Sequence, residues 1–91
     1  MVEEIESVLF TKKFKKAYQN LPSFVQKAFD EKLDLMLNDF LHPSLRIKRI
    51  QGTNDKWEGS VSMKYRFTFE IQEKVLIFRA IGTHDILNRE S

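Results

Sequence analysis

The chain has 91 residues, 42% of them hydrophobic, and a net charge of +2, which allows one domain with a single core and excludes a multidomain enzyme with its own cofactor fold. It contains no cysteine and two histidines, so a disulfide framework and a thiolate zinc site are excluded, and neither a metal nor a cofactor is expected. No apolar run approaches the roughly 18 residues of a membrane span, and the acidic start is unlike a signal peptide. We therefore expect a soluble, cytoplasmic protein.

The first half of the chain predicts one short strand and two helices. Residues 7–10 are apolar and β-prone, and Thr11 after them has the side chain of a helix N-cap. Apolar residues then recur at the spacing of an amphipathic helix at Phe14, Ala17, Tyr18 and Leu21. Pro22 should end this helix and open a longer one over residues 23–40, which stops before His42-Pro43 because a residue that precedes proline avoids the helical conformation.

In the second half the hydrophobic period changes from 3.6 to 2, and residues 45–50 predict a strand. Residues 57–63 and 65–71 alternate apolar and polar side chains, which is typical of two half-buried antiparallel strands. Residues 75–81 are almost uniformly apolar, which suits an interior strand covered on both faces, and His84-Asp85 follows where this strand ends.

These elements predict a single α+β domain over residues 1–91. Its outline order is β-α-α-β-β-β, with the two N-terminal helices packed on one face of a small antiparallel or mixed sheet. The opposite face should collect the polar members of the alternating strands, which are Glu58, Ser60, Ser62, Arg66 and Thr68. An open polar face on so small a protein is where a ligand would bind or where another chain would cover it.

The positive charge is concentrated in the middle of the sequence. Residues 42–66 carry six basic and two acidic side chains, whereas the segments before and after have one more acidic than basic residue each. A local basic excess in a small domain favours a polyanionic partner, and the alternative is an ordinary solvated surface.

Several short motifs occur along the chain in a characteristic order and spacing. They are Phe14-Lys15-Lys16-Ala17 leading to Leu21-Pro22, His42-Pro43-Ser44-Leu45-Arg46-Ile47-Lys48-Arg49, Gly52, Trp57-Glu58, Lys64-Tyr65-Arg66-Phe67-Thr68-Phe69-Glu70 and Ile81-Gly82-Thr83-His84-Asp85. Together they resemble the RelE/ParE superfamily of toxins from toxin–antitoxin modules, over nearly the whole chain. The closing Gly-x-His-Asp is similar to the branch of RelE-like toxins that ends in His-Asp.

The resemblance implies the toxin of a type II toxin–antitoxin system that a cognate antitoxin neutralises. RelE-type members cleave messenger RNA, commonly in the 30S A site of the ribosome, by attack of a 2′-hydroxyl on the adjacent phosphate. That reaction needs a base for the hydroxyl proton, a cation for the charge on the phosphate and an acid for the leaving 5′-oxygen. It needs no metal or cofactor, so the resemblance implies a metal-independent endoribonuclease that inhibits translation.

The resemblance also implies three catalytic residues. Arg66 falls on the strand arginine that contacts the scissile phosphate, and His84 falls where members place an arginine or histidine for proton transfer. Glu58 lies near a position where well-known members carry a lysine, and it could act as the general base. The structural alternatives are a pairing of Arg66 with Glu58 or Glu70, a His84 that caps the sheet, and a Glu58 bound to Arg66 or Lys48. Residues 86–89 lack the aromatic side chain that many of these enzymes use near the C-terminus.

Five further basic residues are candidates for binding the RNA backbone, namely Arg46, Lys48, Arg49, Lys64 and Arg79. Strand alternation places Arg46 and Lys48 on one face and Arg49 on the other. Arg79 lies inside an apolar strand, so it is either a buried charge with a partner such as Glu70 or a residue of the site.

Two other functions remain open from the residues. The first is a ParE-like toxin that binds DNA gyrase and has no enzymatic activity, although His84 favours the nuclease. The second is a degenerate homologue that only binds an antitoxin-like partner. This alternative stays open because Glu58 and Ser60 stand where family members usually carry lysines, and because no aromatic side chain occurs in residues 86–89.

Overall fold

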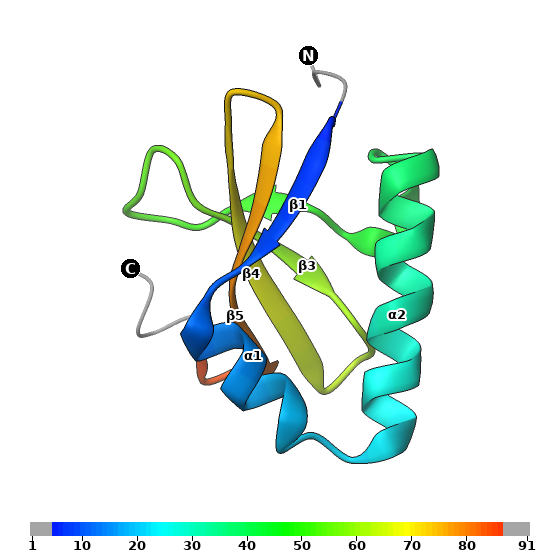
Figure 1. Cartoon of the computed structure of the whole chain (residues 1–91). Coiled ribbons are helices and arrows are strands. Elements are labelled where there is room, and N and C mark those ends of the chain that lie inside the picture. The colour runs from blue at the N-terminus through cyan, green and yellow to red at the C-terminus, as the bar shows by residue number, and fades with distance from the viewer. Residues whose placement is uncertain (1–4, 87–91) are drawn as a thin grey trace.

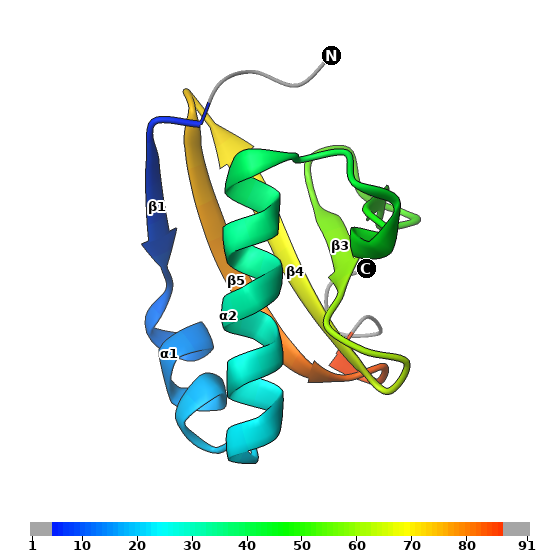
Figure 2. The same ribbon diagram turned by 90° about the vertical axis from the view of Figure 1, so that its right-hand side faces the viewer.

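A five-stranded mixed sheet carries two helices on one of its faces (Figures 1 and 2), as the sequence predicted. The computed structural model describes residues 5–86. The elements are β1 Ser7–Phe10, α1 Lys12–Gln19, α2 Ser23–Asn38, the 3₁₀ turn η1 Pro43–Leu45, β2 Lys48–Arg49, β3 Trp57–Ser60, β4 Tyr65–Gln72 and β5 Val75–Thr83. The described chain thus runs β-α-α-β-β-β-β, with one strand more than the predicted order β-α-α-β-β-β.

The strand order in the sheet is β1-β5-β4-β3-β2. The first strand, β1, pairs in parallel with the last, β5, and all other neighbours are antiparallel. Because β5 lies between β1 and β4, it is an interior strand, which agrees with its nearly continuous apolar sequence. The long connection between these parallel strands runs through both helices and then through β2, β3 and β4.

The strand predicted over residues 45–50 is much shorter in the structure. Pro43 begins the η1 turn instead, and Arg46 after it adopts the left-handed conformation with φ 50°, which interrupts an extended chain. Only Lys48 and Arg49 remain to pair with β3. The next predicted strand, 57–63, ends at Ser60 because the chain turns toward β4, so that Met63 is 95% exposed and not on the apolar side.

The start of α1 is fixed by Thr11. Its side-chain oxygen accepts a hydrogen bond from the amide of Phe14 at 3.1 Å, which is the predicted N-cap. Its hydroxyl also donates to the carbonyl of Arg79 in β5 at 3.2 Å. Thr11 therefore ties the beginning of the first helix to the interior strand.

The core is a cluster of phenylalanine rings between the helices and the sheet. Phe29 of α2 lies within 5.3–5.5 Å, centroid to centroid, of Phe14 in α1, Phe67 in β4 and Phe78 in β5. All four side chains are buried. Rings at these separations attract one another beyond the burial of their area, so Phe29 holds both helices to the same face.

Gly59 in β3 lies directly beneath the ring of Phe67, its neighbour on β4. A Cβ atom at position 59 would be 2.3 Å from the Cζ atom of that ring, whereas among residues 5–86 a Cβ at Gly82 would meet a single side-chain methyl group, Cγ2 of Ile86, at 2.9 Å. The core therefore has no space for a methyl group at position 59.

We expect Gly59→Ala to lower the free energy of unfolding by about 2 kcal/mol, because the buried ring must move. Urea denaturation followed by circular dichroism measures the loss, with Gly82→Ala as the matched control, which should lose less than about 1 kcal/mol. Equal losses in the two variants would contradict the account of this contact.

Two hydrogen bonds join the helices to each other. The Tyr18 hydroxyl in α1 donates to Asp30 Oδ1 in α2 at 2.8 Å, and Gln26 Nε2 donates to the carbonyl of Tyr18 at 2.7 Å. Burial raises the pKa of the Tyr18 hydroxyl, and the hydrogen bond to Asp30 and its negative charge raise it further.

The raised pKa of Tyr18 predicts a loss of stability at alkaline pH. The folded state holds this proton more tightly than the unfolded state, so the contribution is complete below pH 10.0 and falls as the pH rises through the folded value. The difference in unfolding free energy between wild type and Tyr18→Phe should be about 0.5 kcal/mol at pH 8, the low end for a hydrogen bond because this one is exposed to solvent, and it should shrink above about pH 10. Lysine titration cancels in this difference, and a difference that stays constant to pH 11 would contradict the prediction.

Candidate functional site

The polar side chains of β3 and β4 lie on the sheet face opposite the helices. The register pairs Glu58 with Thr68 and Ser60 with Arg66, while Gly82 of β5 flanks Arg66 on its other side. Neighbouring strands place paired residues on the same face, so these side chains form one surface, as predicted. We call it the polar face.

This face is less open than the sequence suggested. Glu58 and Ser60 are each 7% exposed and Thr68 is fully buried, so only Arg66 among the paired polar residues is partly accessible. Ser62, also predicted here, lies exposed in the turn after β3. Ile86, which follows β5, contacts the same face, because its side chain reaches the position that a Cβ of Gly82 would occupy. Strand alternation alone cannot reveal such a contact.

Arg66 lies at the end of the β3–β4 hairpin, and the backbone of the turn fixes its guanidinium. Its Nη1 donates to the carbonyls of Ser62, Met63 and Tyr65, the last two at 3.1 Å. No ion pair joins it to Glu58 or Glu70 within residues 5–86, so neither predicted carboxylate pairing occurs there. Since Nη1 makes all three bonds, the other N–H donors of this group have no partner among residues 5–86 and can bind a ligand.

The two other predicted catalytic residues lie at different distances from Arg66 along the sheet. His84 is exposed in the turn after β5, two residues beyond Gly82, so it emerges at the same end of the sheet as Arg66. Glu58 lies two residues along β3 from Ser60, a rise of about 7 Å, and it is buried. Across the described chain, no ion pair links it to Lys48, its cross-strand neighbour. The fold thus brings Arg66 and His84 to the same end of the sheet and places Glu58 farther along the strands, in the buried part of the polar face.

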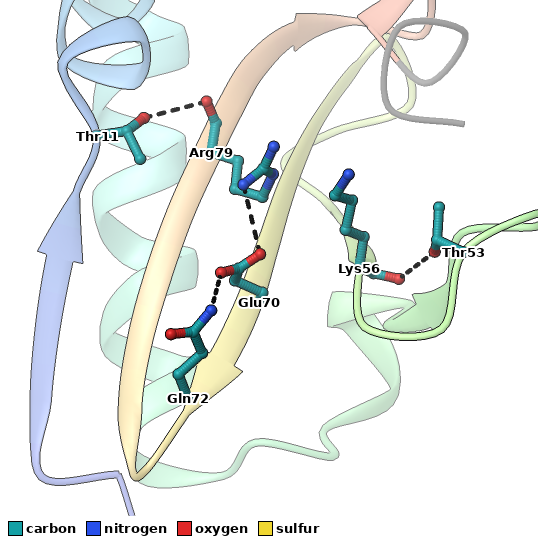
Figure 3. A network of polar contacts seen from close by, with 6 residues as sticks. All are labelled: Thr11, Thr53, Lys56, Glu70, Gln72 and Arg79. Atoms are coloured by element: carbon teal, nitrogen blue, oxygen red, sulfur yellow. Dashed lines mark hydrogen bonds and ion pairs between the residues drawn. The ribbon is translucent and has the colours of Figure 1, made fainter.

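A bulge in β5 places Arg79 on the polar face. Thr68 pairs with Ala80 and Phe69 with Phe78, so Arg79 is the extra residue between them. Its Nη1 lies 3.4 Å from Glu70 Oε2, and Gln72 Nε2 donates to the other carboxylate oxygen at 2.5 Å (Figure 3). The sequence analysis named Glu70 as a partner for Arg79 but did not name Gln72 as a partner for Glu70. Gln72 lies two residues after Glu70 on β4, and this spacing places both side chains on the same face of the sheet.

The other predicted RNA-binding residues do not form one surface. Lys48 on β2 is the cross-strand neighbour of Glu58 on β3, so it lies on the polar face. Arg49 is the neighbour of Trp57, and its guanidinium carbon lies 5.6 Å from the centre of the Trp57 ring. Arg46 is exposed at the end of η1, outside the strand, so its predicted alternation with Lys48 is wrong. Lys64 extends from the hairpin turn, 6.0 Å from the ring of Tyr65.

Between residues 5 and 86 there is no group of three or more histidine, aspartate and glutamate side chains that could hold a metal ion. In the same part of the chain, neither helix is long and apolar enough to cross a membrane.

No protein-family model matches the sequence, and no curated protein matches it significantly. Solved structures do match its fold. The RelE toxin in the RelB–RelE complex from Methanococcus jannaschii aligns with a TM-score of 0.73 and 23% identity, covering 90% of this chain and 96% of that one. The structure of the Escherichia coli DinJ–YafQ toxin–antitoxin complex aligns at 0.71 and 17%, covering 93% and 98%. The YoeB/ParE toxin from Agrobacterium tumefaciens aligns at 0.74 and 10%, covering 87% and 99%. The chain therefore has the fold of the RelE, YafQ and YoeB toxins.

The Glu70–Arg79 pair should stabilise the protein more than the surface pair Glu6–Lys74. The side chain of Glu70 is 10% exposed, whereas that of Glu6 is 64% exposed. Glu70→Gln should lower the free energy of unfolding by about 1.5 kcal/mol, because it leaves a half-buried guanidinium with a weaker partner. The matched variant Glu6→Gln should lose less than about 0.5 kcal/mol. Urea denaturation of both tests this, and an equal effect would refute the assignment.

Proposed function

We propose that this chain is the toxin of a type II toxin–antitoxin pair and that it cleaves messenger RNA on its polar face. The observation that carries the proposal is the guanidinium of Arg66, which three backbone carbonyls hold at the accessible end of this face, with N–H donors that have no partner among residues 5–86. Such a group can bind two oxygens of one phosphate. The fold of the RelE and YafQ toxins, which have been solved together with their antitoxins, supports the same assignment.

The reaction proposed is transfer of the phosphate within the RNA chain. The 2′-oxygen attacks the adjacent phosphorus and loses its proton to a base, the bond to the 5′-oxygen breaks, and an acid protonates that oxygen. The products are a 2′,3′-cyclic phosphate and a 5′-hydroxyl. Arg66 stabilises the negative charge that grows on the phosphate, and His84 supplies the proton to the leaving oxygen. Glu58 accepts the 2′-hydroxyl proton, and this role requires the substrate to reach the interior of the polar face.

The remaining cations supply affinity. Lys48 and Arg79 on the polar face and Lys64 on the hairpin turn lie on either side of Arg66 along the sheet, where they suit the phosphates that flank the cleaved bond. Arg46 and Arg49 lie outside this path and would contact a larger RNA, such as that of the 30S A site. The proposed substrate places the protein in the cytoplasm, with a cognate antitoxin as its protein partner.

We expect Arg66→Ala to reduce RNA cleavage by about 10²–10³-fold, because the charge on the phosphate loses its main cation. His84→Ala should reduce it by about 10²-fold or more through loss of the proton donor. Growth after induction and mapping of RNA 5′ ends in the same cells measure both effects. Lys27→Ala, which removes an exposed cation from α2, is the matched control and should remain toxic.

Urea denaturation of each variant must accompany the assay, because Arg66 also binds the hairpin turn. Full toxicity of a folded Arg66→Ala/His84→Ala double variant would overturn the proposal. Growth arrest with intact RNA and damaged DNA would instead indicate a gyrase inhibitor. Absence of any growth effect from the wild-type chain would indicate a homologue that only binds its partner.

A further inference from the structure

The β3–β4 hairpin holds the guanidinium of Arg66 through one nitrogen. Nη1 donates to the backbone carbonyls of Ser62, Met63 and Tyr65, whereas Nε and Nη2 have no partner among residues 5–86. In the planar guanidinium the Nε–H bond and one N–H bond of Nη2 point in the same direction, so together they form one edge of the group. This edge is therefore left for two oxygens of a phosphate.

The carbonyl of Ser62 is held differently from that of Tyr65. The Tyr65 oxygen accepts the amides of Val61 at 3.0 Å and Ser62 at 3.3 Å, which are backbone bonds of the hairpin. In the part of the chain that the structure describes, the Ser62 oxygen accepts hydrogen bonds only from the side chains of Ser60 and Arg66. A carbonyl oxygen has two lone pairs, so both bonds form together. The orientation of this carbonyl thus depends on side chains.

Ser60 lies where it can fix that carbonyl. Its hydroxyl donates to the Ser62 oxygen at 2.9 Å, and it is the cross-strand neighbour of Arg66. Ser60 is 7% exposed, so little water competes for its hydroxyl, and giving up this bond would leave a buried donor without an acceptor. The serine hydroxyl from β3 and the guanidinium from β4 therefore meet at one carbonyl oxygen.

We propose that Ser60 is a positioning residue for Arg66. Its hydroxyl fixes the Ser62 carbonyl, this carbonyl helps to hold Nη1, and the edge formed by Nε and Nη2 then faces the phosphate. The inference rests on the proposed function, which assigns a phosphate of RNA to Arg66. A cation that is already oriented does not have to reorganise when charge grows on the phosphate. Loss of the Ser60 hydroxyl therefore lowers the rate of cleavage, while the affinity supplied by the other cations remains.

Steady-state cleavage by the purified full chain on translating ribosomes separates the two effects. Ser60→Ala should lower kcat by about tenfold, because a misplaced guanidinium stabilises the transition state less well. KM should change less than about twofold. Ser60→Thr keeps the hydroxyl and should restore kcat to within about threefold of the wild type.

The matched control is Thr53→Val, which also removes a hydroxyl bonded to a backbone carbonyl. Thr53 Oγ1 donates to the carbonyl of Ile50 at 2.7 Å, in a turn that does not contact Arg66. Urea denaturation should show a similar loss of stability in Thr53→Val and Ser60→Ala. Only Ser60→Ala should lose kcat, since only its hydroxyl acts on the carbonyl that holds Arg66.

A second measurement follows Arg66 directly and needs no RNA. The ¹⁵N relaxation order parameter of the Arg66 Nε–H bond should be near about 0.85 in the wild type and in Ser60→Thr, and below about 0.6 in Ser60→Ala. The absence of one signal in Arg66→Ala assigns the resonance. Titration of the wild type with inorganic phosphate should move this signal, because Nε lies on the free edge.

Three results would each overturn the inference. They are a Ser60→Ala variant that cleaves as fast as Thr53→Val, an order parameter of Arg66 that does not fall in Ser60→Ala, and an Arg66 signal that phosphate does not move. A wild-type chain that cleaves no RNA would instead contradict the proposed function. The order parameter tests the hold on Arg66 without any substrate, so the two can fail separately.

Discussion

The contact of Phe29 with the sheet determines how the two faces of this protein differ. Its ring packs on Phe14, Phe67 and Phe78 and so fixes both helices on one side. Phe67 and Phe69 occupy alternate positions of β4, and the alternation that turns them toward the helices turns Arg66, Thr68 and Glu70 to the other face. The candidate site is thus a direct consequence of the core.

The β5 bulge connects the polar face to the start of the helical layer. Arg79 directs its side chain to Glu70 on the polar face, while its carbonyl accepts a hydrogen bond from Thr11 at the N-terminus of α1 (Figure 3). One irregular residue therefore positions a cation of the candidate site and anchors the first helix. Bulges often redirect side chains next to functional sites in this way.

The sequence predicted those parts of the fold in which hydrophobic periodicity is strong. The strand at 7–10, the N-cap at Thr11 and the alternation in β4 agree with the structure. The prediction was wrong where the local backbone conformation departs from the hydrophobic pattern. At Arg46 the backbone is left-handed, so the strand predicted over residues 45–50 is reduced to two residues. The common face of Glu58, Ser60 and Arg66 followed from strand register, but the burial of Glu58 and Ser60 did not, because burial depends on tertiary contacts that strand alternation does not specify. The backbone carbonyls that hold Arg66 could not be predicted either, because a pattern of side chains does not specify how the backbone of a turn is oriented.

The chemical nature of the cleaved RNA ends tests the central claim most directly. In the proposed reaction, attack by the 2′-hydroxyl, with Arg66 bound to the phosphate and His84 as the acid, leaves a 2′,3′-cyclic phosphate and a 5′-hydroxyl. Purified protein incubated with translating ribosomes, followed by mass spectrometry of the fragment ends, should find these two groups, and Arg66→Ala should reduce their amount about 10²–10³-fold. Fragments with a 3′-hydroxyl and a 5′-phosphate, or cleavage unchanged in Arg66→Ala, would contradict the account.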